Sequence, residues 1–199
     1  MRHGARVAAL LAVLALPAGH AAAQQATAED ALREAHAVLL NLVADGETPE
    51  RDGAADIYRS TIEDPDAPRL VTRVELALNP CRARTISTLQ FPGRWATLTL
   101  GLVDLGRIET VEAYASVDDM ISGARPLSFD DPRAEQVILT GEGLLCSSRI
   151  SLADDDRPQA TTCGDRLDLT MMDEEQRARG LSALAAVARH CKVAALRRP

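Results

Sequence analysis

The chain has 199 residues, with 22 basic and 29 acidic side chains and a formal net charge of −7. Its length fits one domain with a hydrophobic core of its own. The negative charge argues against nucleic acid and against anionic membranes as partners, and the single tryptophan leaves little for stacking on sugars or bases.

The first 23 residues have the order of a secretory signal peptide. Arg2 and Arg6 precede an apolar run from Val7 to Leu16, and the small-residue triplet Ala21-Ala22-Ala23 follows. The apolar run is too short to span a bilayer. We expect the mature chain to begin at Gln24, with 20 basic and 29 acidic side chains and a net charge of −9. The alanine- and arginine-rich composition is typical of a GC-rich bacterial genome, so we predict a periplasmic or secreted bacterial protein without a membrane span.

An N-terminal helix is predicted over Ala28–Ala44, because apolar residues such as Leu32 and Leu39 recur there at helical spacing. The stretch Glu47–Arg69 is acidic and broken by prolines and glycines. It is predicted to be a solvated connector, with one short helical turn over Ala54–Ser60.

From residue 70 the hydrophobic period changes to two, which predicts strands. Seven are expected: Leu70–Leu78, Arg82–Gln90, Arg94–Leu105, Val111–Ala115, Glu135–Thr140, Leu144–Leu152 and Arg166–Met171. The stretch between the fourth and fifth, as far as Pro132, is predicted to be irregular. Gly141-Glu142-Gly143 is predicted to be the turn of a hairpin.

A second helix is predicted from Asp173 to about Ala195. Acidic residues at its start and basic residues near its end match the helix dipole. Leu181, Leu184 and Cys191 share one apolar face.

These elements predict an α+β fold, with a bent antiparallel sheet or split barrel of about seven strands. The C-terminal helix caps the sheet and the N-terminal helix precedes it. The expected organisation is a signal peptide (1–23), an N-terminal helix with an acidic connector (24–69) and an antiparallel β domain with its C-terminal helix (70–199).

Three anchors carry a resemblance to a known group of proteins. They are Cys81 before the second strand, the strand end Val103-Asp104-Leu105-Gly106-Arg107-Ile108, and the helix segment from Leu181 to Cys191. Over about residues 70 to 195 this order resembles small exported bacterial proteins with a pleckstrin-homology-like barrel, most of which are uncharacterised. The segment 112–132 and the N-terminal segment depart from that pattern. The resemblance implies the architecture above and transfers no catalytic residue.

The four cysteines are predicted to form two structural disulfides. No CxxC pair is present, which argues against a redox centre and against a zinc site. Four cysteines allow three pairings. Cys146 and Cys163 are equidistant from the polar loop at Asp154-Asp155, so a hairpin there would set them opposite one another and leave Cys81 with Cys191.

No catalytic, cofactor-binding or metal-binding residue is predicted. His36 and His190 are the two histidines of the mature chain, lie on different predicted helices and accompany no G-x-S-x-G motif. The acidic clusters Asp118-Asp119, Asp130-Asp131 and Asp154-Asp155-Asp156 lack EF-hand spacing. They are interpreted as solvated turns, although calcium binding is the alternative.

Two further features have a structural and a functional interpretation. Trp95 and Phe91 flank a Pro-Gly turn, where they close one end of the core or border a pocket. Four arginines fall near the second and third strands: Arg82, Arg84, Arg94 and Arg107. Salt bridges to neighbouring acids are the favoured interpretation of this group, and a patch for an anionic ligand is the alternative.

The sequence therefore predicts an exported, non-enzymatic binding or interaction module. Its partner is an unidentified protein or small molecule, and no cofactor is expected. The alternatives are an inhibitor or immunity-type protein against an envelope enzyme, which an acidic protein could block by charge complementarity, and a small envelope hydrolase.

Overall fold

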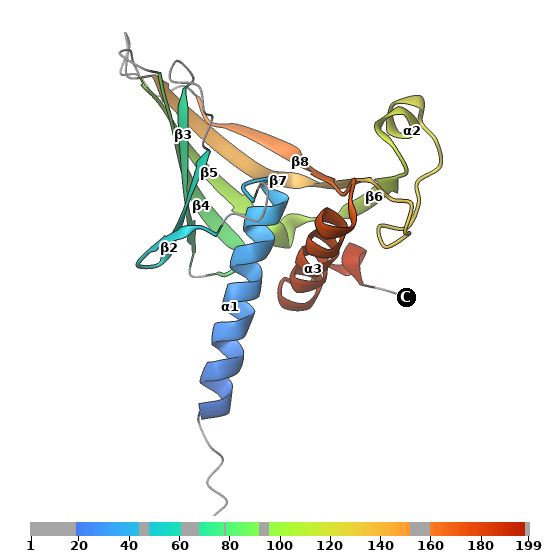
Figure 1. Cartoon of the computed structure of the whole chain (residues 1–199), viewed down its shortest axis with the longest axis horizontal. Helices are drawn as coiled ribbons and strands as arrows, with labels where there is room; N and C mark the ends of the chain where they lie inside the picture. Colours follow the sequence, from blue (N-terminus) through green and yellow to red (C-terminus); the bar gives the residue numbers. More distant parts are fainter. Residues whose placement is uncertain are drawn as a thin grey trace, which may run out of the picture.

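An antiparallel sheet of eight strands, bent and not closed into a barrel, wraps around one helix (Figure 1). The computed structural model describes residues 19–43, 48–60, 68–77, 79–91, 96–151 and 160–197. The helices are α1 (Gly19–Leu39), α2 (Val117–Ser122), α3 (Glu174–His190) and the short 3₁₀ helices η1 (Leu105–Arg107) and η2 (Ala194–Leu196). The strands are β1 (Glu50–Asp52), β2 (Ala55–Ser60), β3 (Arg69–Leu76), β4 (Arg82–Gln90), β5 (Ala96–Asp104), β6 (Thr110–Tyr114), β7 (Gln136–Ser151) and β8 (Thr162–Thr170).

Strand β7 belongs to both parts of the sheet. Strands β1 to β5 follow one another in order, and β5 pairs with the second half of β7, from Leu145 to Ser151. The first half of β7, Gln136 to Thr140, pairs with β6. Strand β8 pairs with both halves of β7 on its other edge. The α+β class and the antiparallel sheet predicted from the sequence are confirmed.

The hairpin predicted at residues 141–143 is wrong, because β7 runs through it as one strand. A Cβ atom at Gly141 would overlap the carbonyl oxygen of Arg107, and Gly143 has φ 66°. The Gly143 N–H donates to Oδ1 of Asp165 at 2.8 Å. The register with β8 shifts between Thr140 and Leu145. The glycines therefore permit a close approach and a bulge rather than a chain reversal.

The helical turn predicted over Ala54–Ser60 is also wrong, because within the described part of the predicted connector β1 and β2 extend the sheet. Asp56 and Tyr58 face the side of the sheet on which α1 lies. Asp56 is 3% exposed and accepts from Nε of Arg51 at 3.0 Å. Tyr58 packs with Val74 and Ala83. Burying these two side chains favours a strand, in which alternate residues share one face.

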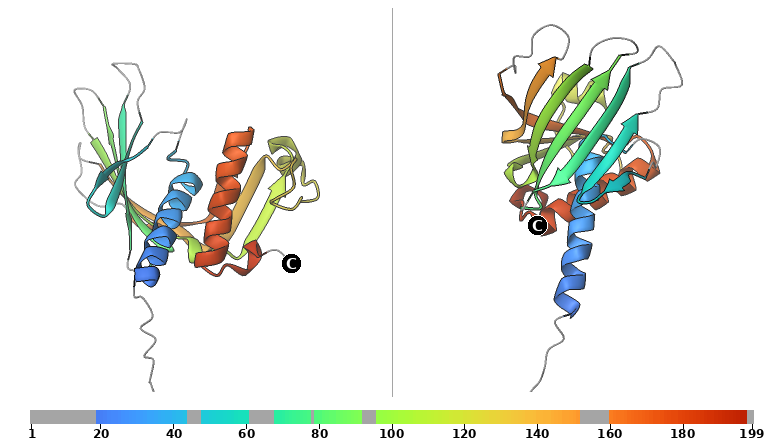
Figure 2. Two further views of the ribbon diagram at one scale, coloured as in Figure 1. Left: turned by 60° about the horizontal axis from the view of Figure 1, so that its bottom comes forward. Right: turned by 90° about the vertical axis from the view of Figure 1, so that its left-hand side faces the viewer.

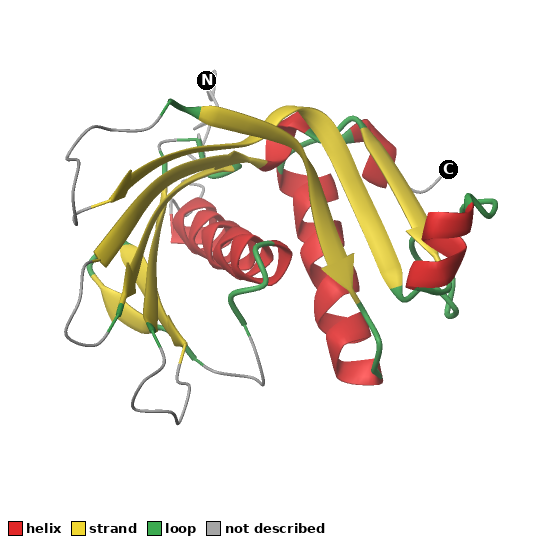
Figure 3. Cartoon of the chain, turned by 90° about the horizontal axis from the view of Figure 1, so that it is seen from above, coloured by secondary structure: helices red, strands yellow, loops and turns green. Residues whose placement is uncertain are grey.

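The N-terminal helix lies inside the curve of the sheet (Figure 3) and beside α3 (Figure 2, left). It begins before the predicted start and ends five residues before the predicted end. Asn41 has φ 54°, which stops helical geometry. Its first turns project beyond the sheet (Figure 1). The segment predicted to be irregular up to Pro132 contains α2, which Ser116 caps by accepting the N–H of Asp119.

The main core lies between α1, α3 and the part of the sheet formed by β6, β7 and β8. The residues Leu39, Leu139, Leu144 and Leu184 are at most 2% exposed there. The C-terminal helix is capped at its start by Asp173, which accepts the N–H of Gln176 at 2.7 Å. This cap agrees with the predicted start of the helix. The predicted end near Ala195 is wrong, because α3 ends at His190 and Lys192 has φ 59°, which stops helical geometry.

Candidate functional site

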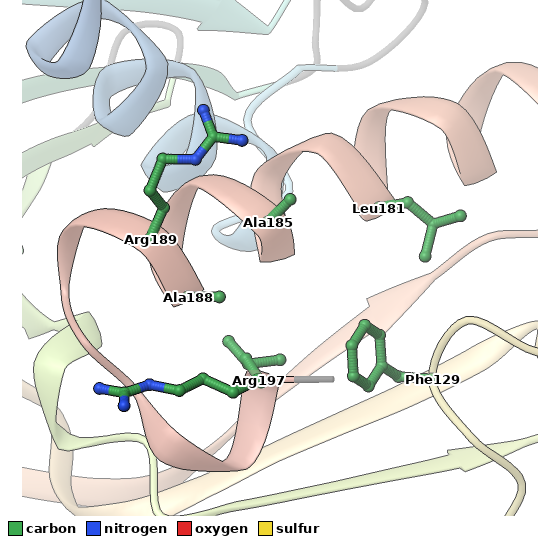
Figure 4. A pocket seen from close by; sticks show the side chains of 7 residues that line it. Phe129, Leu181, Ala185, Ala188, Arg189 and Arg197 are labelled. Atoms are coloured by element: carbon green, nitrogen blue, oxygen red, sulfur yellow. The ribbon is translucent and has the colours of Figure 1, made fainter. Parts of the chain in front are cut away.

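The first candidate site is an apolar groove of about 520 Å³ on the side of α3 away from α1. Figure 4 shows Leu181 on the helix across from Phe129, and Ala185 and Ala188 of the same helix also line the groove. These three helix positions follow one another at spacings of four and three, so they share one face. The 3₁₀ helix η2 closes the groove from below with Leu196, which is 3% exposed.

Two arginines accompany the apolar side chains that line the groove. Arg197 extends toward the end away from Phe129, and its Nη2 donates to the carbonyl oxygen of Lys192 at 3.1 Å (Figure 4). Arg189 leaves α3 near the same end, but its guanidinium group points away from the groove (Figure 4). The groove therefore combines a small-residue helix surface, one aromatic ring and positive charge at one end.

The second candidate site is a polar pocket of about 390 Å³ at the end of α3. Its lining comes from the turn before β4, the end of β5, η1 and the end of α3: Asn79, Cys81, Arg82, Asp104, Gly106, Arg107, His190 and Cys191. Nε of Arg82 lies 2.6 Å from Oδ2 of Asp104, and Nε of Arg107 lies 3.4 Å from the same oxygen. Two of the four arginines noted in the sequence therefore meet at one carboxylate.

Of the other two arginines, Arg84 does not line this pocket. Arg84 pairs with Glu75 at 2.8 Å, and Arg94 lies outside the described residues. The predicted salt bridging of Arg82 and Arg84 is therefore confirmed.

The two histidines lie in different surroundings. His36 is fully buried, and its Nε2 lies 3.3 Å from the carbonyl oxygen of Pro80. Burial lowers the pKa of His36 to about 4, against the smaller opposite effects of that hydrogen bond and of Asp104. Its Nδ1 has no hydrogen-bond partner among the described residues. His190 lines the polar pocket with Asp104, and no serine contributes to that lining.

The disulfides join Cys81 to Cys191 and Cys146 to Cys163, which is the connectivity predicted from the sequence. Cys146 and Cys163 are register partners on β7 and β8. The first bridge forms one wall of the polar pocket. Two disulfides indicate an oxidising compartment outside the cytoplasm.

Two of the three acidic clusters lie in the described part of the chain. Asp118 and Asp119 lie in the first turn of α2. Asp131 accepts hydrogen bonds from the side chain and backbone of Arg133, which lower the pKa of this carboxyl to about 2. The predicted loop 154–156, like Trp95, lies outside the described residues. No group of three metal-ligating side chains occurs in the part of the chain that the structure describes.

The sequence interpretation missed the groove because its walls come from distant segments. The helical spacing predicts Leu181 on the apolar face of the C-terminal helix, but no pattern in the sequence indicates that Phe129 or Leu196 lines a site. Comparisons with protein-family models, curated proteins and solved structures find no match to this chain. The barrel resemblance therefore stays a prediction. Among the described helices, none has the length and apolar character needed to cross a membrane.

Proposed function

We propose that this protein is an exported, non-enzymatic binding module whose ligand combines an apolar chain with a negatively charged group. The apolar groove of Figure 4 is the proposed site. The observation that supports this proposal is the groove's chemistry: its volume of about 520 Å³ falls within the range of small-ligand sites, and its lining is mostly apolar.

The charge of the site supports an acidic ligand. Arg189 and Arg197 border the groove, while the chain as a whole has a net charge of −7. An apolar chain would lie along Ala185 toward Phe129 and Leu181, and a carboxylate would lie at the arginine end. Burying the chain supplies affinity, and Arg197 selects for the acid.

The proposal of a binding protein rather than an enzyme is supported by the surroundings of the histidines. A serine hydrolase needs a histidine within hydrogen-bond reach of its nucleophile. His36 is fully buried with Nε2 at Pro80, and His190 lines a pocket of arginines. Export is supported by the two disulfides and by the signal-like residues 1–23. Intact-mass measurement of protein from the native host tests export, and we expect a chain that begins at Gln24.

Titration of the disulfide-bonded protein with dodecanoate, followed by calorimetry, tests the groove. Ala185→Trp fills the groove from an exposed position, so we expect it to abolish binding without loss of stability. Ser182→Trp on the same helix lies outside the lining and is the matched control. Arg197→Gln should weaken dodecanoate binding about tenfold, the size of one charge-assisted hydrogen bond, while leaving dodecanol binding unchanged. Equal binding by the Ala185 and Ser182 variants would overturn the proposal.

A second candidate function, an inhibitor that binds another protein, is favoured by the outer face of the sheet. No described helix covers strands β3 to β5 on that side (Figure 2, right). Ile86, Leu100 and Leu102 project from it with exposed fractions of 37%, 41% and 42%. The partner surface would be apolar. Leu100→Glu distinguishes the two functions, because it would abolish capture of an envelope enzyme and leave dodecanoate binding unchanged.

A further inference from the structure

Asp104 holds two guanidinium groups at the polar pocket. The aspartate ends β5 and is 6% exposed. Its Oδ2 contacts Nε of both Arg82 and Arg107, and its Oδ1 accepts the N–H of Gly106 at 3.2 Å. A carboxylate fixed by the backbone in this way fixes the position of both arginines.

The outer parts of these guanidinium groups remain available. The side chains of Arg82 and Arg107 are 47% and 51% exposed. Arg107 uses Nη1 to donate to the carbonyl oxygen of Glu142 at 2.9 Å. Among the described residues, no acceptor binds the Nη groups of Arg82 or Nη2 of Arg107. Several N–H donors, on guanidinium groups that Asp104 holds in position, are therefore exposed to solvent beside one pocket.

The disulfide makes the pocket rigid. Cys81 precedes Arg82, and Cys191 follows His190. The disulfide therefore holds the backbone of Arg82 and of His190 close together. The N–H of Cys81 donates to Oδ1 of Asn79 at 3.0 Å, which orders the turn on the other side. Positions fixed before binding reduce the entropy that a ligand must overcome.

The charge of the pocket is not balanced. Its lining holds two arginines and one acid, Asp104, together with the imidazole of His190. Glu109 and Glu142 do not line this pocket; they line an adjoining hollow of about 250 Å³, which Arg107 also borders. A buried carboxylate needs one cation for neutralisation, and here it has two. The second guanidinium leaves an excess positive charge on a chain whose net charge is −7.

We propose that this pocket is a second binding site, independent of the groove, for an oxyanion presented as a phosphate or carboxylate group. Arg82 and Arg107 would donate to the oxyanion with their Nη groups, and Asp104 is a positioning residue that holds them in place. Paired guanidinium groups suit the planar, charge-assisted contacts that phosphate and carboxylate oxygens accept.

Titration of the ¹⁵N-labelled, disulfide-bonded protein with inorganic phosphate tests the site, with sodium chloride at equal ionic strength as the salt control. We expect saturable shifts of the backbone amides of Gly106 and His190 and no such shifts with chloride. A parallel titration with succinate distinguishes the two kinds of oxyanion. Tighter binding of phosphate would identify a phosphate ligand, and tighter binding of succinate would identify a carboxylate ligand. Absence of saturable shifts with both anions would overturn the proposal.

Arg107→Gln should weaken the binding of the preferred anion about tenfold or more, the effect of losing charge-assisted hydrogen bonds. Arg84→Gln is the matched control, since this arginine lies on the same strand as Arg82 but pairs with Glu75 outside the pocket. If Arg107→Gln does not fold, Arg107→Lys keeps the charge and loses the guanidinium fork, and it should weaken binding less than tenfold. Equal affinity of the Arg84 and Arg107 variants would contradict the proposal, whatever the groove binds.

Discussion

Cys81 and Cys191 are 110 positions apart in the chain, and their disulfide brings their Cα atoms to 5.7 Å. The bridge ties the turn before β4 to the end of α3. His36 of α1 contacts Pro80 in the same turn, so α1, α3 and the sheet meet at this point. The other disulfide, between Cys146 and Cys163, joins neighbouring strands and spans 17 positions.

Removing the long-range disulfide should destabilise the protein more than removing the short one. In the chain-entropy model the long loop contributes about 4.7 kcal/mol and the short loop about 3 kcal/mol. Urea unfolding of the Cys81→Ser/Cys191→Ser and Cys146→Ser/Cys163→Ser proteins measures the difference. A larger loss in the second protein would mean that neighbouring contacts, not loop length, set the stabilisation.

The buried face of α3 should not tolerate charge. Leu184 is fully buried, so Leu184→Asp should cost several kcal/mol, on the order of 3, by burying an unpaired carboxylate. Ser182→Asp lies on the exposed side of the same helix and should change stability little. Thermal unfolding of both proteins gives the comparison, and equal melting temperatures would contradict the assignment of the buried face.

Local patterns in the sequence predicted those helices and strands for which the spacing of the segment's own apolar side chains is sufficient. The alternation of apolar and polar residues predicted the strand over Arg82–Gln90, which is β4, and the spacing of the cysteines about the loop at 154–155 predicted Cys146 opposite Cys163. The predicted secondary structure is wrong where contacts with a distant segment of the chain determine it. β2 forms because Asp56 and Tyr58 are buried beside α1, and nothing in Ala55–Ser60 alone indicates that burial.

The candidate sites were harder to predict because each joins distant segments. The pairing of Arg82 and Arg107 at Asp104 depends on the register of β4 with β5, where Arg82 lies opposite Asp104. Phe129 reaches the groove only because residues 117–134 fold back beside α3 (Figure 2, left). Residue types near one another in sequence identified the arginine group but not its geometry.

Gly141 should not tolerate a side chain. An added Cβ would overlap the carbonyl oxygen of Arg107, so Gly141→Ala should cost about 1 to 3 kcal/mol through a forced backbone shift. Gly164→Ala on the paired strand is the control, because its Cβ would meet only the carbonyl oxygen of Leu145, at 3.8 Å. Chemical unfolding separates the two. A neutral Gly141→Ala would show that β7 can move away from η1 freely.

Stability should fall as the pH is lowered from about 6.5 to about 4, because of His36. The pKa of this buried imidazole is lowered from 6.5 to about 4 in the folded protein. Between these values the unfolded chain binds a proton that the folded protein does not, so acid favours unfolding. The full effect of this pKa difference is about 3 kcal/mol, reached below pH 4, where both states are protonated.

Urea unfolding at several pH values between 4 and 7 measures this dependence. His36→Gln removes the titrating group, so its free energy of unfolding should lose this part of the pH dependence, even though the variant is less stable throughout. His190→Gln is the control and should keep the part of the slope that His36 contributes, because His36 is unchanged in it. The same slope in the His36 variant would assign the acid sensitivity to other groups. The carboxyl of Asp131, with its pKa of about 2, contributes stability above its ordinary pKa near 3.8 and loses it only below this window.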